Sequence, residues 1–372
     1  MRFRGEGAIQ DVVGDRILYR NLIPVNRRLP GIDELREKLG ILAGEHPRKG
    51  TERHARVVAE IVQAAARQAG TANDLARWVY VGDTRQSDGA TFRGLCQVTG
   101  RPGWAFIAGE CDEPGSEQRH ADSRLVFAHS WAEIDAFFAA AGAAGFGCGS
   151  NTAVIVDLDK TLFGARGRND HVVDGTRTAA ALSVVCEAVG STEPAGLANV
   201  YAEINHSRFR GFVEDNQDVV VYLSTLVVSG SVPLSDLEGR GSDQAGKGFR
   251  AFLEEVNRRR SSLSPGMRSF HDAVYGRALA GCPTLVPAFR RAEYRETVAR
   301  MSGAAAGAPV DQLLQKRVVI TGEVWDVLRA WQERGALVFA LSDKPDEAAF
   351  PSAEAPVDAR PIHATPTCII GG

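Results

Sequence analysis

An apolar run that ends in two aspartates is the feature of this sequence that most constrains its fold. Residues Ala153 to Leu162 read AVIVDLDKTL, so a β-branched apolar segment leads directly into Asp157 and Asp159. A strand that is apolar on both faces is typical of a parallel sheet covered by helices on both sides. Carboxylates at the carboxyl end of such a strand lie where open α/β sheets bind ligands. The stretch therefore predicts an α/β fold with a site at this sheet edge.

Two other apolar strands also end in polar side chains. A strand over residues 78–81 precedes Asp83 and Asp88, and the strand ALVFAL precedes Ser342. Parallel strands bring their carboxyl ends to one edge, so we expect these groups to join the first pair of aspartates. Carboxylates in one crevice raise one another's pKa unless a divalent cation neutralises them. Oxygen ligands without a nearby imidazole favour Mg²⁺ over zinc.

Such a set of groups suits phosphoryl transfer. The transition state spreads negative charge over the equatorial oxygens of phosphorus, which a metal ion, a lysine and a hydroxyl group stabilise. A carboxylate can attack phosphorus and form an acyl phosphate that water later cleaves. A second acid two residues further along can protonate the leaving oxygen.

At these residues the chain resembles the haloacid dehalogenase-like hydrolases, most of which are Mg²⁺-dependent phosphatases. DLDKT at 157–161 resembles the first motif of that family, DxDxT. VFALSDKP resembles the second motif, a strand that ends in Ser or Thr, and VYVGDTRQSD resembles the fourth, GDx4D. The resemblance implies an α/β three-layer sandwich with a parallel, Rossmann-like sheet and a mainly helical cap domain.

The order of the motifs differs from that of the family. The apparent third and fourth motifs precede the first, which resembles a circular permutation of the haloacid dehalogenase-like core. A Gly-rich stretch near 139–151 would join the closing helix of the core to the opening strand. The expected organisation is a first part of the core at 1–171, a helical cap at 172–318 and a second part of the core at 319–372.

The resemblance implies a role for each aspartate. Asp157 would be the nucleophile and a metal ligand. Asp159 would act as general acid and base, and its backbone carbonyl would bind Mg²⁺. Asp83 would ligate the metal, with Asp88 as a second ligand or as the residue that orients the first.

Two further residues would hold the oxygens of the transferring phosphoryl group. Ser342, in the second motif, would be one of them. The other would be the lysine that forms the family's third motif, which lies upstream of the fourth. Lys49 resembles that lysine because a helix and a connection separate it from Asp83, while Lys344 is a rival at the same sheet edge. A solvated basic face is the expectation for Arg166, with contact to an anionic substrate as the alternative.

The composition limits the classes of partner. A net charge of -3 over 372 residues gives no reason to expect a nucleic-acid partner. No apolar run approaches the roughly eighteen residues of a membrane span, and the amino terminus lacks the apolar core of a signal peptide, so we expect a cytoplasmic protein without a membrane partner. The six scattered cysteines form no CxxC pair, which indicates free thiols.

The expected function is therefore Mg²⁺-dependent hydrolysis of a small phosphorylated metabolite through an aspartyl phosphate. Asp159 argues against dehalogenase and phosphonate hydrolase activity, because those relatives lack the second aspartate of the first motif. Two alternatives stay open: a phosphotransferase or phosphomutase with the same motifs, and a catalytically idle domain that binds a phosphorylated ligand or a partner.

Overall fold

The chain forms two compact units in a computed structural model. The structure describes residues 1–71, 75–109, 115–120, 122–190, 196–213, 216–238, 247–301 and 307–372. The first unit comprises Met1–Asp174 and Thr297–Gly372, and the second comprises Gly175–Glu296. Both boundaries fall within helices, α6 (Asp170–Val189) and α13 (Pro287–Met301), which run from one unit into the other. Since α14 (Val310–Lys316) belongs to the first unit, the helical unit ends earlier than the 172–318 expected from the sequence.

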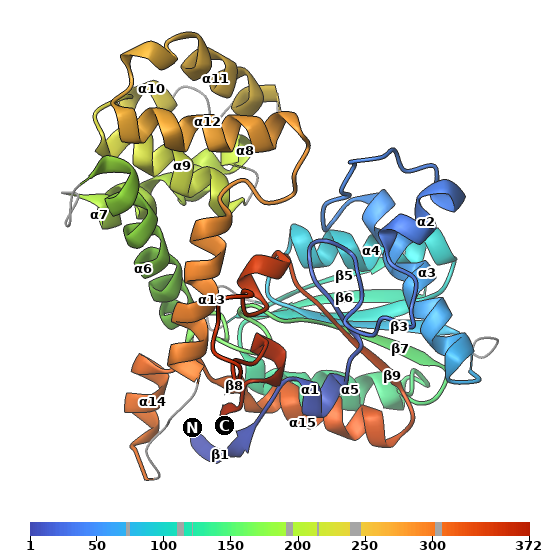
Figure 1. The fold of residues 1–372 in the computed structure, drawn as a ribbon. Coiled ribbons are helices and arrows are strands. Elements are labelled where there is room, and N and C mark those ends of the chain that lie inside the picture. Colours follow the sequence, from blue (N-terminus) through green and yellow to red (C-terminus); the bar gives the residue numbers. More distant parts are fainter. Residues whose placement is uncertain are drawn as a thin grey trace. The chain divides into compact units, whose positions relative to one another are not determined.

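The first unit is built on a mainly parallel sheet of seven strands (Figure 1). Its order is β2 (Ile17–Leu18), β9 (Leu337–Leu341), β7 (Thr152–Asp157), β3 (Arg77–Gly82), β4 (Gly103–Ala108), β6 (Ser123–Ala128) and β5 (Ser116–His120). The edge strand β5 runs antiparallel to β6, and the other pairs are parallel. The α/β fold with a mainly parallel sheet is confirmed, as is the pairing of β3 with β7, in which Trp78 lies opposite Ala153.

Helices cover both faces of this sheet (Figure 1). One face carries α2 (Ile32–Leu39), α3 (Glu52–Gln68) and α4 (Ser87–Thr99), and the other carries α1 (Gln10–Val13), α5 (Ile134–Ala143) and α15 (Gly322–Glu333). The apolar stripe of α3, with Val58 and Ile61, packs in one core with Tyr80 and Ile155. Because strand residues alternate between faces, both helical layers find apolar partners on every central strand.

Ser130 caps the short 3-10 helix η1 (Trp131–Glu133) that leads directly into α5. Ser130 accepts a hydrogen bond from the backbone N–H of Ala132, and the Glu133 carboxylate accepts one from the Ser130 N–H at 3.0 Å. On the sheet side, the ring of Phe137 lies 5.5 Å from that of Phe106. These contacts fix the helix that leads into β7.

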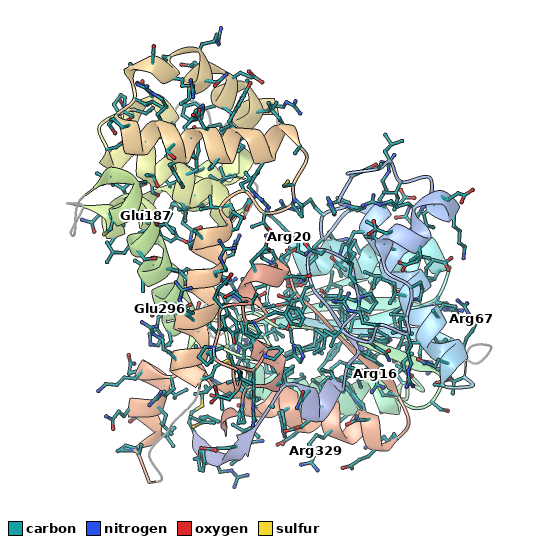
Figure 2. The ribbon with its side chains drawn as sticks, in the orientation of Figure 1. Arg16, Arg20, Arg67, Glu187, Glu296 and Arg329 are labelled. Atoms are coloured by element: carbon teal, nitrogen blue, oxygen red, sulfur yellow. The ribbon has the colours of Figure 1, made fainter. Side chains whose placement is uncertain are left out.

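The two ends of the chain meet in a small second sheet. Strand β1 (Arg2–Gly7) pairs antiparallel with β10 (Thr367–Gly371), which pairs in parallel with β8 (Ile320–Thr321). Arg2 lies opposite Gly371, so the termini are neighbours. After β1, Arg16, which is labelled in Figure 2, ties the chain to the main sheet. Its Nε donates to the carbonyl of Val338 in β9 at 2.9 Å.

The second unit is helical in the residues that the structure describes. Besides its parts of α6 and α13, it contains α7 (Leu197–Ile204), α8 (Arg210–Val213), α9 (Gln217–Val228), α10 (Ser235–Glu238), α11 (Lys247–Arg258) and α12 (Pro265–Leu279). The valine-rich run DVVVYLSTLVV, whose residues also favour a strand, lies within α9, and its residues Asp218 to Leu226 are buried. Arg290 is buried between Asp218 at 3.1 Å and Glu293 at 2.8 Å.

None of the described helices is long and apolar enough to cross a membrane.

Candidate active site

Three carboxylates gather at the carboxyl edge of the central strands. Asp157 ends β7, Asp83 follows β3, and Asp88 lies in the first turn of α4. One oxygen of each lies within 4.8 Å of the others, which is the spacing of a group that can hold a metal ion. The predicted convergence of these three residues is therefore observed.

A buried lysine neutralises two of these carboxylates. Lys49 lies just before α3, and its Nζ contacts Oδ1 of Asp157 and lies 2.6 Å from Oδ1 of Asp88. Its side chain is 5% exposed. Burial alone would lower the pKa of Lys49, but the two carboxylates outweigh it and raise that pKa well above its usual value. The two carboxylates therefore favour the charged form of Lys49 beside Asp157.

Asp88 is saturated with hydrogen-bond donors and holds the loop after β3. The Tyr80 hydroxyl and Lys49 reach its Oδ1, and its Oδ2 accepts bonds of 2.8 to 3.0 Å from the N–H groups of Asp83 and Thr84 and from the Thr84 hydroxyl. Burial would raise its pKa, but Lys49 and Thr84 bring it down to about 2. A Cβ at Gly82 would lie 2.5 Å from Cγ of Asp88, so this packing requires glycine.

Asp83 has a different environment, because its partner is an arginine. Arg166, from the loop after β7, contacts Oδ2 of Asp83 with Nε at 2.6 Å and Nη2 at 2.5 Å. Burial and the charge of Asp88 raise the pKa of Asp83 to about 7 in spite of this arginine. Arg166, expected on a solvated basic face, is partly exposed and also pairs with Asp83. The position of Arg166 just after DLDKT singles it out as a possible anion contact, but no sequence feature predicts its pair with Asp83.

Asp157 keeps one oxygen available. Its Oδ1 accepts from Lys49, and Oδ2 accepts no hydrogen bond from any residue that the structure describes. Burial raises the pKa of Asp157 well above its usual value, and the negative charges of Asp88 and Asp83 raise it further. The nearby Lys49 lowers this pKa but does not outweigh them. A buried carboxylate under this repulsion favours a cation beside its free oxygen.

Asp159 belongs to a second cluster with two residues that follow β9. The Ser342 hydroxyl donates to its Oδ2 at 2.9 Å, and Lys344 Nζ lies 3.0 Å from its Oδ1. The Lys344 N–H donates to the Ser342 hydroxyl at 3.0 Å, which closes a small ring of contacts. The side chain of Asp159 is therefore not part of the three-carboxylate cluster, and the two candidate lysines each serve a different aspartate.

The loop after β7 is tightly built. Lys160 has φ of 63°, a left-handed conformation that non-glycine residues rarely adopt, and its N–H donates to the carbonyl of Phe163 at 2.9 Å. The side chain of Thr161 is buried, and its carbonyl accepts from the Thr321 hydroxyl at 2.5 Å. These hydrogen bonds fix the turn, and with it the positions of Asp159 and Arg166 on either side of it.

Other expectations concern residues away from this edge. Cys96, Cys148, Cys186, Cys282 and Cys368 form no disulfide bond, as predicted, while Cys111 lies outside the described residues. Comparison of the chain with protein-family models, curated proteins and solved structures finds no match. The assignment of a function therefore depends on the geometry of the carboxylates and their cations.

Proposed function

We propose that this protein is a Mg²⁺-dependent phosphomonoester hydrolase that acts through an aspartyl phosphate at Asp157. The observation that carries the proposal is the meeting of Asp157, Asp83 and a buried Lys49 at the carboxyl ends of two adjacent parallel strands. A carboxylate with one free oxygen, a second carboxylate for a metal and a fixed cation are the groups that phosphoryl transfer to an aspartate needs.

The strand order supports a circularly permuted haloacid dehalogenase-like core. Strands β9, β7 and β3, which carry the second, first and fourth motifs, are neighbours in the sheet although β3 comes first in the chain. Arg2 and Gly371 lie opposite each other in the small sheet, so in an unpermuted chain a short connection could join these two residues. In this interpretation the Gly-rich stretch after α5 replaces the ends of the unpermuted chain.

The acidic cluster suits Mg²⁺ by the chemistry of its donors. Asp83 and Asp157 are hard oxygen ligands, and the free Oδ2 of Asp157 and the raised pKa values of both residues indicate a need for positive charge. Since the oxygens of Asp88 already accept from five donors, we propose that Asp83 ligates directly and that Asp88 orients its loop. When bound, Mg²⁺ neutralises charge that develops on the phosphoryl oxygens.

The residues then divide the reaction into two steps. A carboxylate oxygen of Asp157 bonds to phosphorus as the ester P–O bond breaks, and the leaving oxygen takes a proton from Asp159. In the second step Asp159 takes a proton from water, the water oxygen bonds to phosphorus, and the bond between Asp157 and phosphorus breaks to release phosphate. Lys49 and Ser342 hold the phosphoryl oxygens, which requires Ser342 to exchange its bond to Asp159 for the substrate.

The proposal is tested by the turnover of p-nitrophenyl phosphate. We expect release of p-nitrophenol with Mg²⁺ and its loss when EDTA removes the metal. Binding of phosphate without turnover would favour the idle binding domain instead. Transfer of the phosphoryl group to an added alcohol in preference to water would favour a phosphotransferase.

The effect of Mg²⁺ on thermal stability is expected to depend on pH. Metal binding requires ionised carboxylates, and the pKa of Asp83 is about 7, so Mg²⁺ should raise the melting temperature above pH 7 and lose this effect as pH falls below 7. For one carboxyl group the affinity falls about tenfold for each pH unit below its pKa. The measurement is a melting curve at several pH values with and without Mg²⁺.

The control for this experiment is Asp83→Asn. This variant should show little Mg²⁺ stabilisation at any pH, whereas an equal concentration of NaCl should leave the wild-type protein unchanged. A Mg²⁺ effect of constant size across this pH range would contradict Asp83 as a ligand.

A further inference from the structure

We propose that Arg166 is a second cation of this site, which holds Asp83 while no metal is bound and turns to the phosphoryl group of the substrate once a metal takes Asp83. The inference rests on the proposed function and adds a residue that neither the family motifs nor the strand ends identify. Three observations support it: the exposure of the Arg166 side chain, the hydrogen bonds that hold its backbone, and its contact with Asp83.

Arg166 reaches Asp83 from the solvent side of the cluster. Its side chain is 40% exposed, while that of Asp83 is 6% exposed. Both Nε and Nη2 contact the same oxygen, Oδ2 of Asp83. The side chain of Arg166 therefore connects a buried carboxylate with the protein surface.

The backbone of Arg166 is fixed, so the motion open to this residue is rotation of its side chain. Its N–H donates to the carbonyl of Lys160 at 2.8 Å, and its carbonyl accepts from Nε1 of Trp131 at 3.2 Å. The aliphatic part passes over Gly109, where an added Cβ would lie 3.1 Å from both Cγ and Cδ. Gly109 therefore leaves room for the side chain to lie along the end of β4.

Charge decides between the two positions of the side chain. A guanidinium group and a divalent cation on one carboxylate repel each other, so metal binding at Asp83 weakens the pair with Arg166. The released guanidinium offers a planar fork of donors that matches phosphate oxygens. Asp170 and Asp174 also face Arg166, but Asp174 already pairs with Lys160 at 2.8 Å, and Asp170 Oδ1 accepts from the Gly167 N–H at 3.0 Å.

The test is the binding of Mn²⁺ and of inorganic phosphate to Arg166→Gln. Without phosphate, free Mn²⁺ measured by electron paramagnetic resonance should show about tenfold tighter binding than in the wild type, because a competing cation is gone. With saturating Mg²⁺, calorimetry should show phosphate binding at least about tenfold weaker, because the fork of donors is lost. Arg166→Lys should restore part of the phosphate affinity.

Arg85→Gln is the matched control. Arg85 is an exposed arginine two residues after Asp83, and its guanidinium group stacks on the ring of Phe127 at 4.2 Å. Its loss should leave both affinities near those of the wild type. Weaker Mn²⁺ binding in Arg166→Gln, or unchanged phosphate binding, would overturn the role of Arg166 alone. A wild-type protein that binds no Mn²⁺ would overturn the proposed function itself.

Discussion

Replacing Asp157 with asparagine is expected to lower kcat for p-nitrophenyl phosphate by at least about 10⁴-fold while the fold persists. An amide is a poor nucleophile toward phosphorus. The substitution also removes one negative charge that would bind the metal ion. The measurement is kcat with saturating Mg²⁺, with circular dichroism to check the fold. Asp326→Asn is the control, because Asp326 in α15 pairs with Arg4 in β1 and its loss should leave kcat unchanged.

The same substitution should stabilise the protein in the absence of metal. Burial raises the pKa of Asp157 above its unfolded value of about 4, so the folded state binds more protons and the free energy of unfolding falls as pH rises above that value. Asparagine removes this cost, and the metal-free variant should melt at a higher temperature than the wild type at about pH 8. A variant that keeps substantial activity, or that melts at a lower temperature under these conditions, would contradict the assigned role.

Replacing Lys49 with methionine is expected to lower kcat about a hundredfold or more. Lys49 contacts Asp157 and Asp88 in a buried setting, where the loss of one stabilising cation costs roughly 3 kcal/mol in the transition state. It also leaves two buried carboxylates with less neutralisation, which should lower the free energy of unfolding by about 3 to 5 kcal/mol. Both quantities should be measured, with saturating Mg²⁺ in the kinetic assay.

Lys344→Met provides a comparison of the same kind. Lys344 is also buried and also pairs with an aspartate, Asp159, so the two variants lose similar stabilising contacts. Only Lys49 contacts the proposed nucleophile, and we expect the larger loss of kcat there. The reverse order would assign the third motif to Lys344, and near-normal rates in both variants would contradict either assignment.

The central part of the fold could be predicted because its strands carry a strong local signal. The strand before Asp157 is β-branched and apolar on both faces, which few structures other than a covered parallel sheet accommodate. Once the strands are parallel, their carboxyl ends share an edge, and the meeting of Asp83 with Asp157 follows from topology alone. The order and direction of the strands are enough to predict that these two aspartates lie close together.

Other elements depend on contacts between distant parts of the chain. The small sheet of β1, β8 and β10 joins residues near both termini. Because β8 has only two residues, no local periodicity of the sequence predicts this strand. The Val-rich segment of α9 has strong β propensity, but its burial within a helical unit overrides that preference. Propensity is a weak guide where tertiary packing surrounds a segment on every side.

The site shows the same division at the level of single side chains. Lys49 and Lys344 follow comparable sequence signals, and only the structure shows which one contacts Asp157 and which one contacts Asp159. The pair of Arg166 with Asp83 joins residues more than eighty positions apart, and an arginine after a turn is ordinarily solvated. Such pairings are set by loop geometry, which sequence spacing does not specify.

Chemical trapping of the phosphoryl group tests directly whether Asp157 becomes an aspartyl phosphate. The protein is mixed with p-nitrophenyl phosphate and Mg²⁺, quenched in acid and treated with borohydride, which reduces an aspartyl phosphate to homoserine. We expect homoserine at position 157 by mass spectrometry, present with Mg²⁺ and absent with EDTA. Turnover without modification at Asp157, or modification at another aspartate, would contradict it.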